Sequence, residues 1–262
     1  VEARSFKWIS KYDKSFSEYA DCKQKLIFIV GLPRCGSTLL EQVLLRSDFV
    51  RTMGECDYFE EGLVTTKHRA TFPLSSKKID EVREHYLRNA IFDDKGIYQI
   101  DKMPLNFRYI GPILQCFPNA KIINVNRCCY SNSWSLFKTD FAGYGNSFSY
   151  SLDNIVHFHN LYLETMYKWK SVFGSRILNI SYDNLTNNLS KTVHKLEQFL
   201  DIPTIDAPED FYKNKGFVST ASVSQVKKSI YKNSDQVWKN YKSHLHLHFK
   251  DLIDIRGQNI FQ

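Results

Sequence analysis

The sequence predicts an α/β protein with a P-loop-like three-layer fold, in which a central parallel sheet is flanked by helices. Short apolar runs alternate along the chain with longer segments whose apolar residues recur at helical spacing, which is the pattern of βαβ units. Each apolar run is followed by polar or basic residues, at the place where such sheets bind ligands. A chain of 262 residues is long enough to bury one substantial core.

Four short segments rich in Ile, Val and aromatic residues are expected to be the strands, at residues 25–30, 97–100, 121–126 and 176–181. Helices are expected at residues 38–46, 79–91, 107–116, 131–140, 152–173 and 189–200. The last of these helices is closed by Ile202 and Pro203. We expect residues 1–24 to form an N-terminal helical extension and residues 25–262 to form a single domain.

The net charge of the chain favours one broad class of ligand but does not identify the ligand. The chain carries 35 Lys and Arg against 28 Asp and Glu, a net charge of +7 that favours anionic ligands. No apolar run approaches the length of a membrane span, and the N-terminus lacks the pattern of a signal peptide. The six cysteines show neither a C-x-x-C pair nor zinc spacing. We therefore expect a cytoplasmic, soluble protein of bacterial type with reduced thiols; a lumenal fragment is the less favoured alternative.

The first predicted strand runs directly into the segment GLPRCGST, residues 31–38, and then into a helix. Loop N–H groups and the helix N-terminus would point at one spot and form a cradle for an anion. Arg34, Ser37 and Thr38 would add further donors. The two glycines have P-loop spacing, but Ser37 occupies the place of the essential lysine. A γ-phosphate-transferring NTPase is therefore disfavoured.

Two more polar clusters follow predicted strands. The segment DKMP, residues 101–104, comes directly after the strand at 97–100. Arg127 ends the strand at 121–126, and a serine-rich helix begins soon after it. Because ligands bind outside the carboxyl ends of parallel strands, we expect both clusters to lie near the glycine loop.

Residues 27–42 resemble the 5′-phosphosulfate loop of PAPS-dependent sulfotransferases, whose usual form is P-R-S-G-T-T (PAPS is 3′-phosphoadenosine-5′-phosphosulfate). The likeness is closest to tyrosylprotein sulfotransferases and to bacterial sulfotransferases that follow TPR repeats. It implies transfer of a sulfuryl group from PAPS to an acceptor hydroxyl by in-line displacement, with release of PAP and no metal. It also implies that the 5′ end of the donor is bound by Pro33, Arg34, Cys35, Gly36, Ser37 and Thr38.

The resemblance assigns further residues of the two other clusters. Lys102 corresponds to the lysine that approaches the sulfuryl group, where a fixed ammonium stabilises the charge left on the departing nucleotide. Arg127 and Ser135 correspond to the arginine and serine that bind the 3′-phosphate. Relatives continue from this arginine with Asp-Pro, whereas this chain has Cys128 and Cys129.

The remaining assignments rest on shorter matches. Tyr182, after the last strand, packs near the nucleotide or is an ordinary core tyrosine. Ser222 and Lys228 fall in a segment that resembles the one closing over PAPS. Glu55 matches the catalytic glutamate of tyrosylprotein sulfotransferases and is our candidate for the general base, with Asp57 in reserve. The alternative for Glu55 is an ordinary surface carboxylate.

Two other functions compete with this interpretation. A P-loop nucleotide kinase or NTPase would need the missing lysine, and a non-catalytic polyanion-binding module would spread its basic residues along one face. Here the basic residues cluster after strand ends, so we expect no nucleic acid partner. The acceptor stays open among protein tyrosine, a sugar and a small molecule, and so does a homodimer. The alternating histidines 244, 246 and 248 favour a solvated terminal segment over a metal site.

Overall fold

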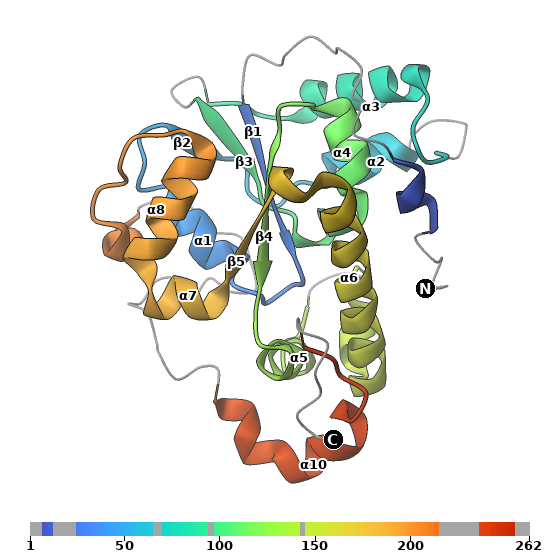
Figure 1. Cartoon of the computed structure of the whole chain (residues 1–262), viewed down its shortest axis with the longest axis vertical. Helices are drawn as coiled ribbons and strands as arrows, with labels where there is room; N and C mark the ends of the chain where they lie inside the picture. Colours follow the sequence, from blue (N-terminus) through green and yellow to red (C-terminus); the bar gives the residue numbers. More distant parts are fainter. Residues whose placement is uncertain are drawn as a thin grey trace.

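The computed structural model describes residues 7–12, 25–64, 70–93, 97–141, 145–214 and 236–254. Within these residues, five strands form one parallel sheet in the order β2-β3-β1-β4-β5 (Figure 1). The strands are β1 (Lys25–Gly31), β2 (Val50–Thr52), β3 (Tyr98–Asp101), β4 (Lys121–Asn126) and β5 (Ile177–Ser181). The predicted α/β class is confirmed.

Helices cover both faces of the sheet (Figure 1). One face carries α2 (Tyr58–Val64), α3 (Ser76–Asn89), α4 (Ile110–Cys116) and α6 (Leu152–Phe173). The other face carries α1 (Ser37–Leu44), α7 (Tyr182–Asn187) and α8 (Leu189–Leu200). Two further helices, α5 (Cys129–Phe137) and α10 (Lys242–Phe249), lie beyond the end of β4. Short 3₁₀ helices complete the described part: Lys7–Lys11, Pro104–Tyr109, Ser147–Tyr150, Gly174–Arg176, Pro208–Lys213 and Val237–Tyr241.

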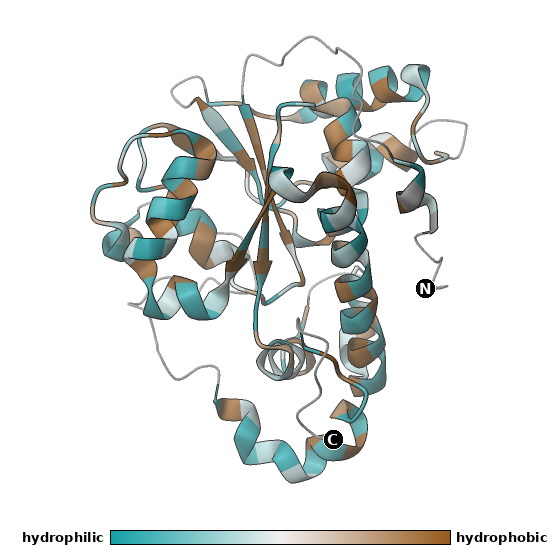
Figure 2. Ribbon diagram, in the orientation of Figure 1, coloured by the Kyte–Doolittle hydropathy of each residue, from teal (hydrophilic) through white to brown (hydrophobic). Residues whose placement is uncertain are grey.

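The central strand β1 is apolar at almost every position because both of its faces are buried. Phe28 and its alternate neighbours pack in the cluster beneath α4 and α6, whereas Ile27 and Ile29 pack beneath α1 and α8. A strand buried on one face only would alternate apolar with polar residues, so this continuous run is typical of a parallel sheet covered on both sides. Figure 2 shows the strands as a predominantly hydrophobic centre.

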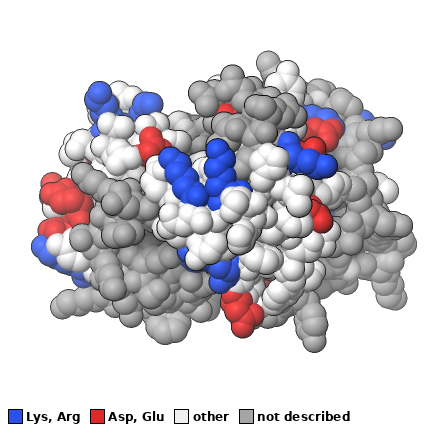
Figure 3. All heavy atoms as spheres, turned by 90° about the horizontal axis from the view of Figure 1, so that it is seen from below, with Lys and Arg blue, Asp and Glu red and all other residues white. Residues whose placement is uncertain are grey.

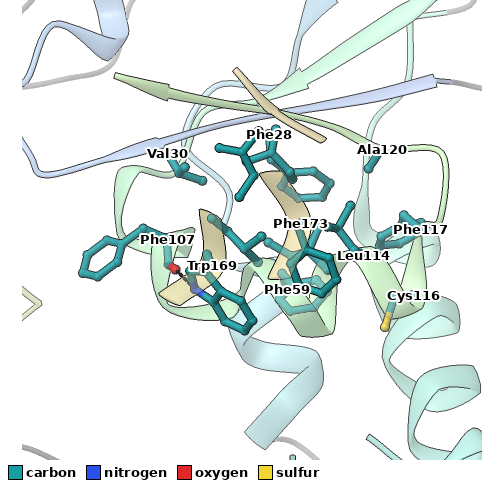
Figure 4. Packing of buried hydrophobic residues seen from close by; sticks show 14 of the residues in the cluster. Phe28, Val30, Phe59, Phe107, Leu114, Cys116, Phe117, Ala120, Trp169 and Phe173 are labelled. Carbon is teal, nitrogen blue, oxygen red and sulfur yellow. Dashed lines mark hydrogen bonds between the residues drawn. The ribbon is translucent and has the colours of Figure 1, made fainter. Parts of the chain in front are cut away.

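The larger core is aromatic (Figure 4). Trp169 of α6 is fully buried, and its indole N–H donates to the carbonyl of Phe107 at 2.9 Å. Burial of such side chains contributes on the order of 1.5–3 kcal/mol each relative to exposure. Trp8 and Tyr12, at the N-terminus, also meet Trp169 edge-on. The described part of the N-terminal extension therefore packs on this core, and the domain boundaries stay a prediction.

The predicted helices match the structure unevenly. The strand at 121–126 and the helices at 152–173 and 189–200 have the predicted bounds. The expected helix at 107–116 divides into a 3₁₀ segment and α4, because Pro112 in the first turn of α4 has no N–H to donate to the carbonyl of Arg108. The helix expected at 79–91 begins earlier, at Ser76, since the hydroxyl of Ser75 caps its first turn. The helix expected at 131–140 begins earlier too, at Cys129.

Among the described strands and α-helices, four short elements were not expected: β2, α2, α7 and α10. Strand β2 has three residues, of which only Val50 is buried, so its apolar pattern is too short to recognise. Helices α2 and α7 span seven and six residues, about two turns each. Over the described residues, no helix is long and apolar enough to cross a membrane.

Candidate active site

Site residues predicted from separate parts of the chain meet along one edge of the sheet. The parallel strands bring their carboxyl ends to that edge. Glu55 follows β2, Lys102 follows β3, the loop 32–36 follows β1, Arg127 follows β4 and Tyr182 follows β5. The order across the sheet therefore places the glycine loop between Lys102 on one side and Arg127 on the other.

Two glycines allow the loop after β1 to pack closely against its neighbours. A Cβ on Gly31 would meet the carbonyl oxygen of Val125 at 2.4 Å, and one on Gly36 would meet the Tyr182 ring at 2.4 Å. Gly36 also has a φ of 104°, in the left-handed region that glycine adopts without strain. Asn132 of α5 donates to the carbonyl of Pro33 at 3.0 Å and holds the loop from the other side.

The loop ends at the N-terminus of α1, where Gly36 is the N-cap and provides no side chain to cap the helix. Ser37 and Thr38, in the first turn, are buried. Backbone N–H groups at such an end are suited to bind an anion. Burial raises the pKa of Cys35 to about 11, so this thiol stays protonated and fills space beneath the loop.

Arg34 and Arg127 form a cationic pair at the β1–β4 side of the site. The Arg34 guanidinium donates to the hydroxyl of Ser135 at 3.2 Å, and Arg127 donates to the carbonyl of Arg34 at 3.2 Å. The Arg127 guanidinium also lies over the Tyr182 ring at 4.5 Å. Burial lowers the pKa of Arg34, and the charge of Arg127 lowers it further. A bound polyanion would offset both charges, and a guanidinium beside a hydroxyl is suited to phosphate.

Lys102 and Glu55 form an ion pair at the β2–β3 side. Lys102 is completely buried, and its ammonium lies 2.6 Å from a carboxylate oxygen of Glu55. The Glu55 side chain is 38% exposed, so it is open to an incoming group. The backbone brings the two together, since the N–H of Lys102 donates to the carbonyl of Gly54 at 2.9 Å. The structure thus joins the two predicted catalytic residues.

Two buried carboxyl groups near Lys102 were assigned no role from the sequence, although Asp101 lies in the recognised DKMP segment. Glu41 of α1 lies 3.8 Å from the Lys102 ammonium. Asp101 is fully buried and accepts from the hydroxyl of Tyr86 at 2.9 Å; burial raises its pKa to about 7. The signal available in the sequence was that Glu41 is the one acidic residue within the apolar helix segment 39–45.

Other predicted residues lie elsewhere or outside the described part. Ser222 and Lys228 lie outside the described residues. Asp57, the reserve base, is an exposed residue; partial desolvation of its carboxyl group raises its pKa, as do its acidic neighbours on α2. Cys128 is the N-cap of α5, and its pKa is lowered to about 6, chiefly by a hydrogen bond from the Cys129 thiol.

No group of three or more His, Cys, Asp or Glu is arranged to hold a metal ion in the described ranges. The three alternating histidines lie on α10, where His246 is two residues from each of the others and does not share a face with His244 and His248. His248 instead contacts Asp153 of α6 at 2.8 Å.

The face seen from below, on the side of α5 and α10, is shown in Figure 3. Several Lys and Arg side chains gather near its middle, with smaller groups of Asp and Glu scattered around them. The β4 strand leads into α5 on this side, so the positive charge lies on the same side as Arg127. Fold and site together define an α/β protein with a sheet edge suited to anions beside a buried lysine.

Comparison with known proteins places this arrangement in a family. A model of the Sulfotransferase family matches residues 27–206. The chain therefore belongs to the Sulfotransferase family, and the resemblance noted from its motifs is confirmed.

Three curated relatives align with most of the chain. An uncharacterized protein of Aquifex aeolicus is 32% identical over 84% of this chain and 31% of its own length. Protein-tyrosine sulfotransferase 1 of Danio rerio is 26% identical, over 82% of this chain and 62% of its own length. The protein-tyrosine sulfotransferase of Drosophila melanogaster is 24% identical, over 82% of this chain and 44% of its own length. The chain thus spans less than two thirds of the length of each of these relatives.

Solved structures confirm the fold. The sulfotransferase domain of the Synechococcus PCC 7002 olefin synthase matches with a TM-score of 0.59 and 16% identity, over 86% of this chain and 91% of its own. The sulfotransferase domain of the curacin biosynthetic pathway matches with a TM-score of 0.58 and 16% identity, over 84% of this chain and 92% of its own. Mouse sulfotransferase SULT7A1, complexed with PAP, matches with a TM-score of 0.52 and 15% identity, over 92% of this chain and 88% of its own.

Proposed function

We propose that the chain transfers the sulfuryl group of PAPS to an acceptor hydroxyl and releases PAP. The observation that carries this proposal is the order of groups along the sheet edge. A glycine loop and helix N-terminus lie between a buried lysine and a pair of arginines. Such an arrangement suits a nucleotide with a charged group at each end, and PAPS carries a 5′-phosphosulfate and a separate 3′-phosphate.

The two ends of the donor would occupy different parts of the site. The loop amides with Arg34, Ser37 and Thr38 would hold the 5′-phosphosulfate. Arg127 and Ser135, each of which contacts Arg34, would take the 3′-phosphate, because a guanidinium and a hydroxyl together match a dianionic phosphate. Ser222 and Lys228 are proposed to complete the donor site, as the resemblance implies.

The reaction would be an in-line displacement. Glu55 accepts the proton of the acceptor hydroxyl, and the oxygen forms a bond to sulfur. The bond between sulfur and the bridging oxygen breaks, and its electron pair stays on the phosphate of PAP. Lys102 stabilises that developing charge, a contribution of about 3–4 kcal/mol where a single preorganised donor has been removed from other enzymes. By analogy with phosphoryl transfer, positioning and electrostatics supply most of the acceleration.

The acceptor is proposed only as a hydroxyl-bearing group. Two of the curated relatives are protein-tyrosine sulfotransferases, which supports tyrosine as one candidate. A sugar or a small molecule stays equally open, as does a homodimer. The segments expected to shape the acceptor pocket are residues 59–91 and 137–150. The cellular compartment stays a prediction from the sequence.

Isothermal titration calorimetry of PAP, 5′-AMP and ATP tests the donor. PAP is expected to bind at least about tenfold more tightly than 5′-AMP, since one charged hydrogen-bonded contact is worth about 1.5–3 kcal/mol. Transfer of label from ³⁵S-PAPS to a panel of phenols, sugars and peptides then tests the reaction. Tighter binding of ATP than of PAP would overturn the proposal and favour a nucleotide kinase or NTPase.

A pair of arginine variants sharpens this test. Arg127→Ala is expected to weaken PAP binding about tenfold or more while 5′-AMP binding changes little, because only PAP carries the 3′-phosphate. Arg88→Ala, an exposed arginine on α3, is the matched control and should leave both affinities unchanged. If Arg127→Ala weakened the binding of PAP and of 5′-AMP by the same factor, Arg127 would not be the residue that binds the 3′-phosphate.

A further inference from the structure

The buried ammonium of Lys102 pairs with two carboxylates that differ in their surroundings. Its charge also acts on the Asp101 carboxyl and the Cys56 thiol, both of which have a pKa raised by burial. Glu55 contacts it at 2.6 Å with 38% of its side chain exposed. Glu41 approaches it to 3.8 Å with only 4% of its side chain exposed. An acceptor can therefore reach Glu55, whereas Glu41 is enclosed behind the loop and faces Lys102 from the protein interior.

Glu41 is also fixed in place by a circuit of hydrogen bonds. One carboxylate oxygen accepts from the hydroxyl of Thr52 at 2.5 Å, and that hydroxyl accepts from the N–H of Gly54 at 3.0 Å. The carbonyl of Gly54 accepts from the N–H of Lys102 at 2.9 Å. The circuit ties α1, the end of β2 and the residue after β3 together around one ammonium. Burial raises the pKa of Glu41, and the Lys102 charge and the Thr52 hydroxyl oppose this rise.

The charges around Lys102 change during the proposed reaction, and this change suggests a role for Glu41. When Glu55 accepts the proton of the acceptor, it becomes neutral and no longer pairs with Lys102. Negative charge then develops on the departing phosphate, but until it has formed Glu41 is the carboxylate that still pairs with the ammonium. A buried ammonium with no such partner would be costly to keep charged. We propose that Glu41 is a positioning residue that holds Lys102 charged and in place while Glu55 acts as the base. This inference rests on the proposed sulfuryl transfer.

Glu41→Gln tests the proposal, because the amide keeps the size of the side chain and an acceptor for Thr52 but removes the charge. We expect kcat to fall about tenfold or more, with the KM for PAPS changed less than about threefold, which is the pattern of an interaction used in the transition state. The alkaline limb of the rate profile should move to lower pH, because loss of the adjacent negative charge makes proton loss from Lys102 easier.

Two further variants separate positioning from general damage. Glu197→Gln removes a carboxylate of α8 whose side chain is 11% exposed and which accepts from the N–H of Ile205 at 2.8 Å, away from the site. This control should keep both kcat and the pH profile of the unmodified chain. Thr52→Val keeps the charge of Glu41 but removes its hydrogen bond, and should lower kcat less than Glu41→Gln. It also provides the test if Glu41→Gln fails to fold.

The outcomes distinguish this inference from the proposed function. Absence of both PAP binding and sulfuryl transfer in the unmodified chain would overturn the proposed function, and the role of Glu41 with it. Transfer by the unmodified chain, with an unshifted alkaline limb and unchanged kcat in Glu41→Gln, would overturn the role of Glu41 alone. A fall in thermal stability with no change in the pH profile would also overturn it, because that result shows a structural role only.

Discussion

At the scale of single residues, the ion pair between Glu55 and Lys102 joins the proposed base to the group that would stabilise the leaving nucleotide. The pair sits in unequal surroundings, with the ammonium buried and the carboxylate partly exposed. Glu55 can therefore turn toward an acceptor while Lys102 stays with the sheet. The two residues come from loops after different strands, so neither is positioned by its own neighbours in sequence.

Replacing Glu55 tests its role as the base. Glu55→Gln is expected to lower kcat by about 10²–10⁴-fold, the usual contribution of a general base, while PAP binding is retained. Initial rates with ³⁵S-PAPS and calorimetry with PAP measure the two quantities. Glu61→Gln, at a half-exposed carboxylate of α2, is the control and should keep its activity. Undiminished turnover in Glu55→Gln would shift attention to Asp57.

The buried carboxyl of Asp101 predicts a pH dependence of stability. Burial raises its pKa from 3.8 to about 7, so the folded state holds a proton that the unfolded chain loses at lower pH. The contribution of Asp101 to stability is then complete below about pH 4 and is lost as the pH rises toward about 7. Asp101→Asn keeps an acceptor for Tyr86 and cannot ionise. Denaturant unfolding of both proteins from pH 4 to 8 should show the unmodified chain losing stability relative to the variant; parallel profiles would contradict this account.

At the scale of secondary structure, the turn from β1 into α1 was predictable because glycine and the flanking apolar runs are local signals. Its geometry was not. The close approach of Tyr182 to Gly36 and the bond from Asn132 to Pro33 join segments that are distant in sequence. Likewise, β2 carries too few apolar residues to be recognised, yet it is the element that delivers Glu55.

The glycine at the start of α1 gives a prediction at this scale. Gly36→Ala is expected to lower the free energy of unfolding by about 1–3 kcal/mol, because its φ of 104° strains any other residue and its Cβ would strike the Tyr182 ring. PAP affinity should fall as well. Gly145→Ala, where a Cβ would meet nothing within 4 Å, is the matched control. Urea unfolding and calorimetry measure both effects; equal stabilities for the two variants would refute the steric argument.

At the scale of the whole molecule, the helices near the C-terminus support the site from below the sheet. Trp238 is buried and stacks on Tyr130 of α5 with 4.9 Å between ring centroids. Phe249 of α10 packs on the same tyrosine. Helix α5 carries Asn132, which holds the loop, and Ser135, which contacts Arg34. Packing far from the sheet thus bears on the anion site.

Truncating Trp238 tests this support. Trp238→Ala is expected to cost about 3–5 kcal/mol of stability, the range for large-to-small changes of buried aromatics. PAP binding should weaken too, because α5 loses its packing partner. Tyr167→Ala, at a side chain that is 76% exposed, should stay within about 0.5 kcal/mol of the unmodified chain. Guanidinium unfolding measures the stability, and calorimetry measures the PAP affinity. Unchanged PAP affinity in Trp238→Ala would show that the packing of Trp238 on α5 does not affect the site.

The sequence by itself determined the α/β class, most of the helices and strands, and the three clusters that follow strand ends. These features are encoded in local periodicity, in glycine spacing and in the residue types that meet phosphate. The tertiary structure decided which of those clusters touch. Parallel pairing of β2 with β3 brought Glu55 onto Lys102, and pairing of β3 with β1 brought Glu41 to the same ammonium. Such contacts depend on strand order and register, which no local stretch of sequence specifies.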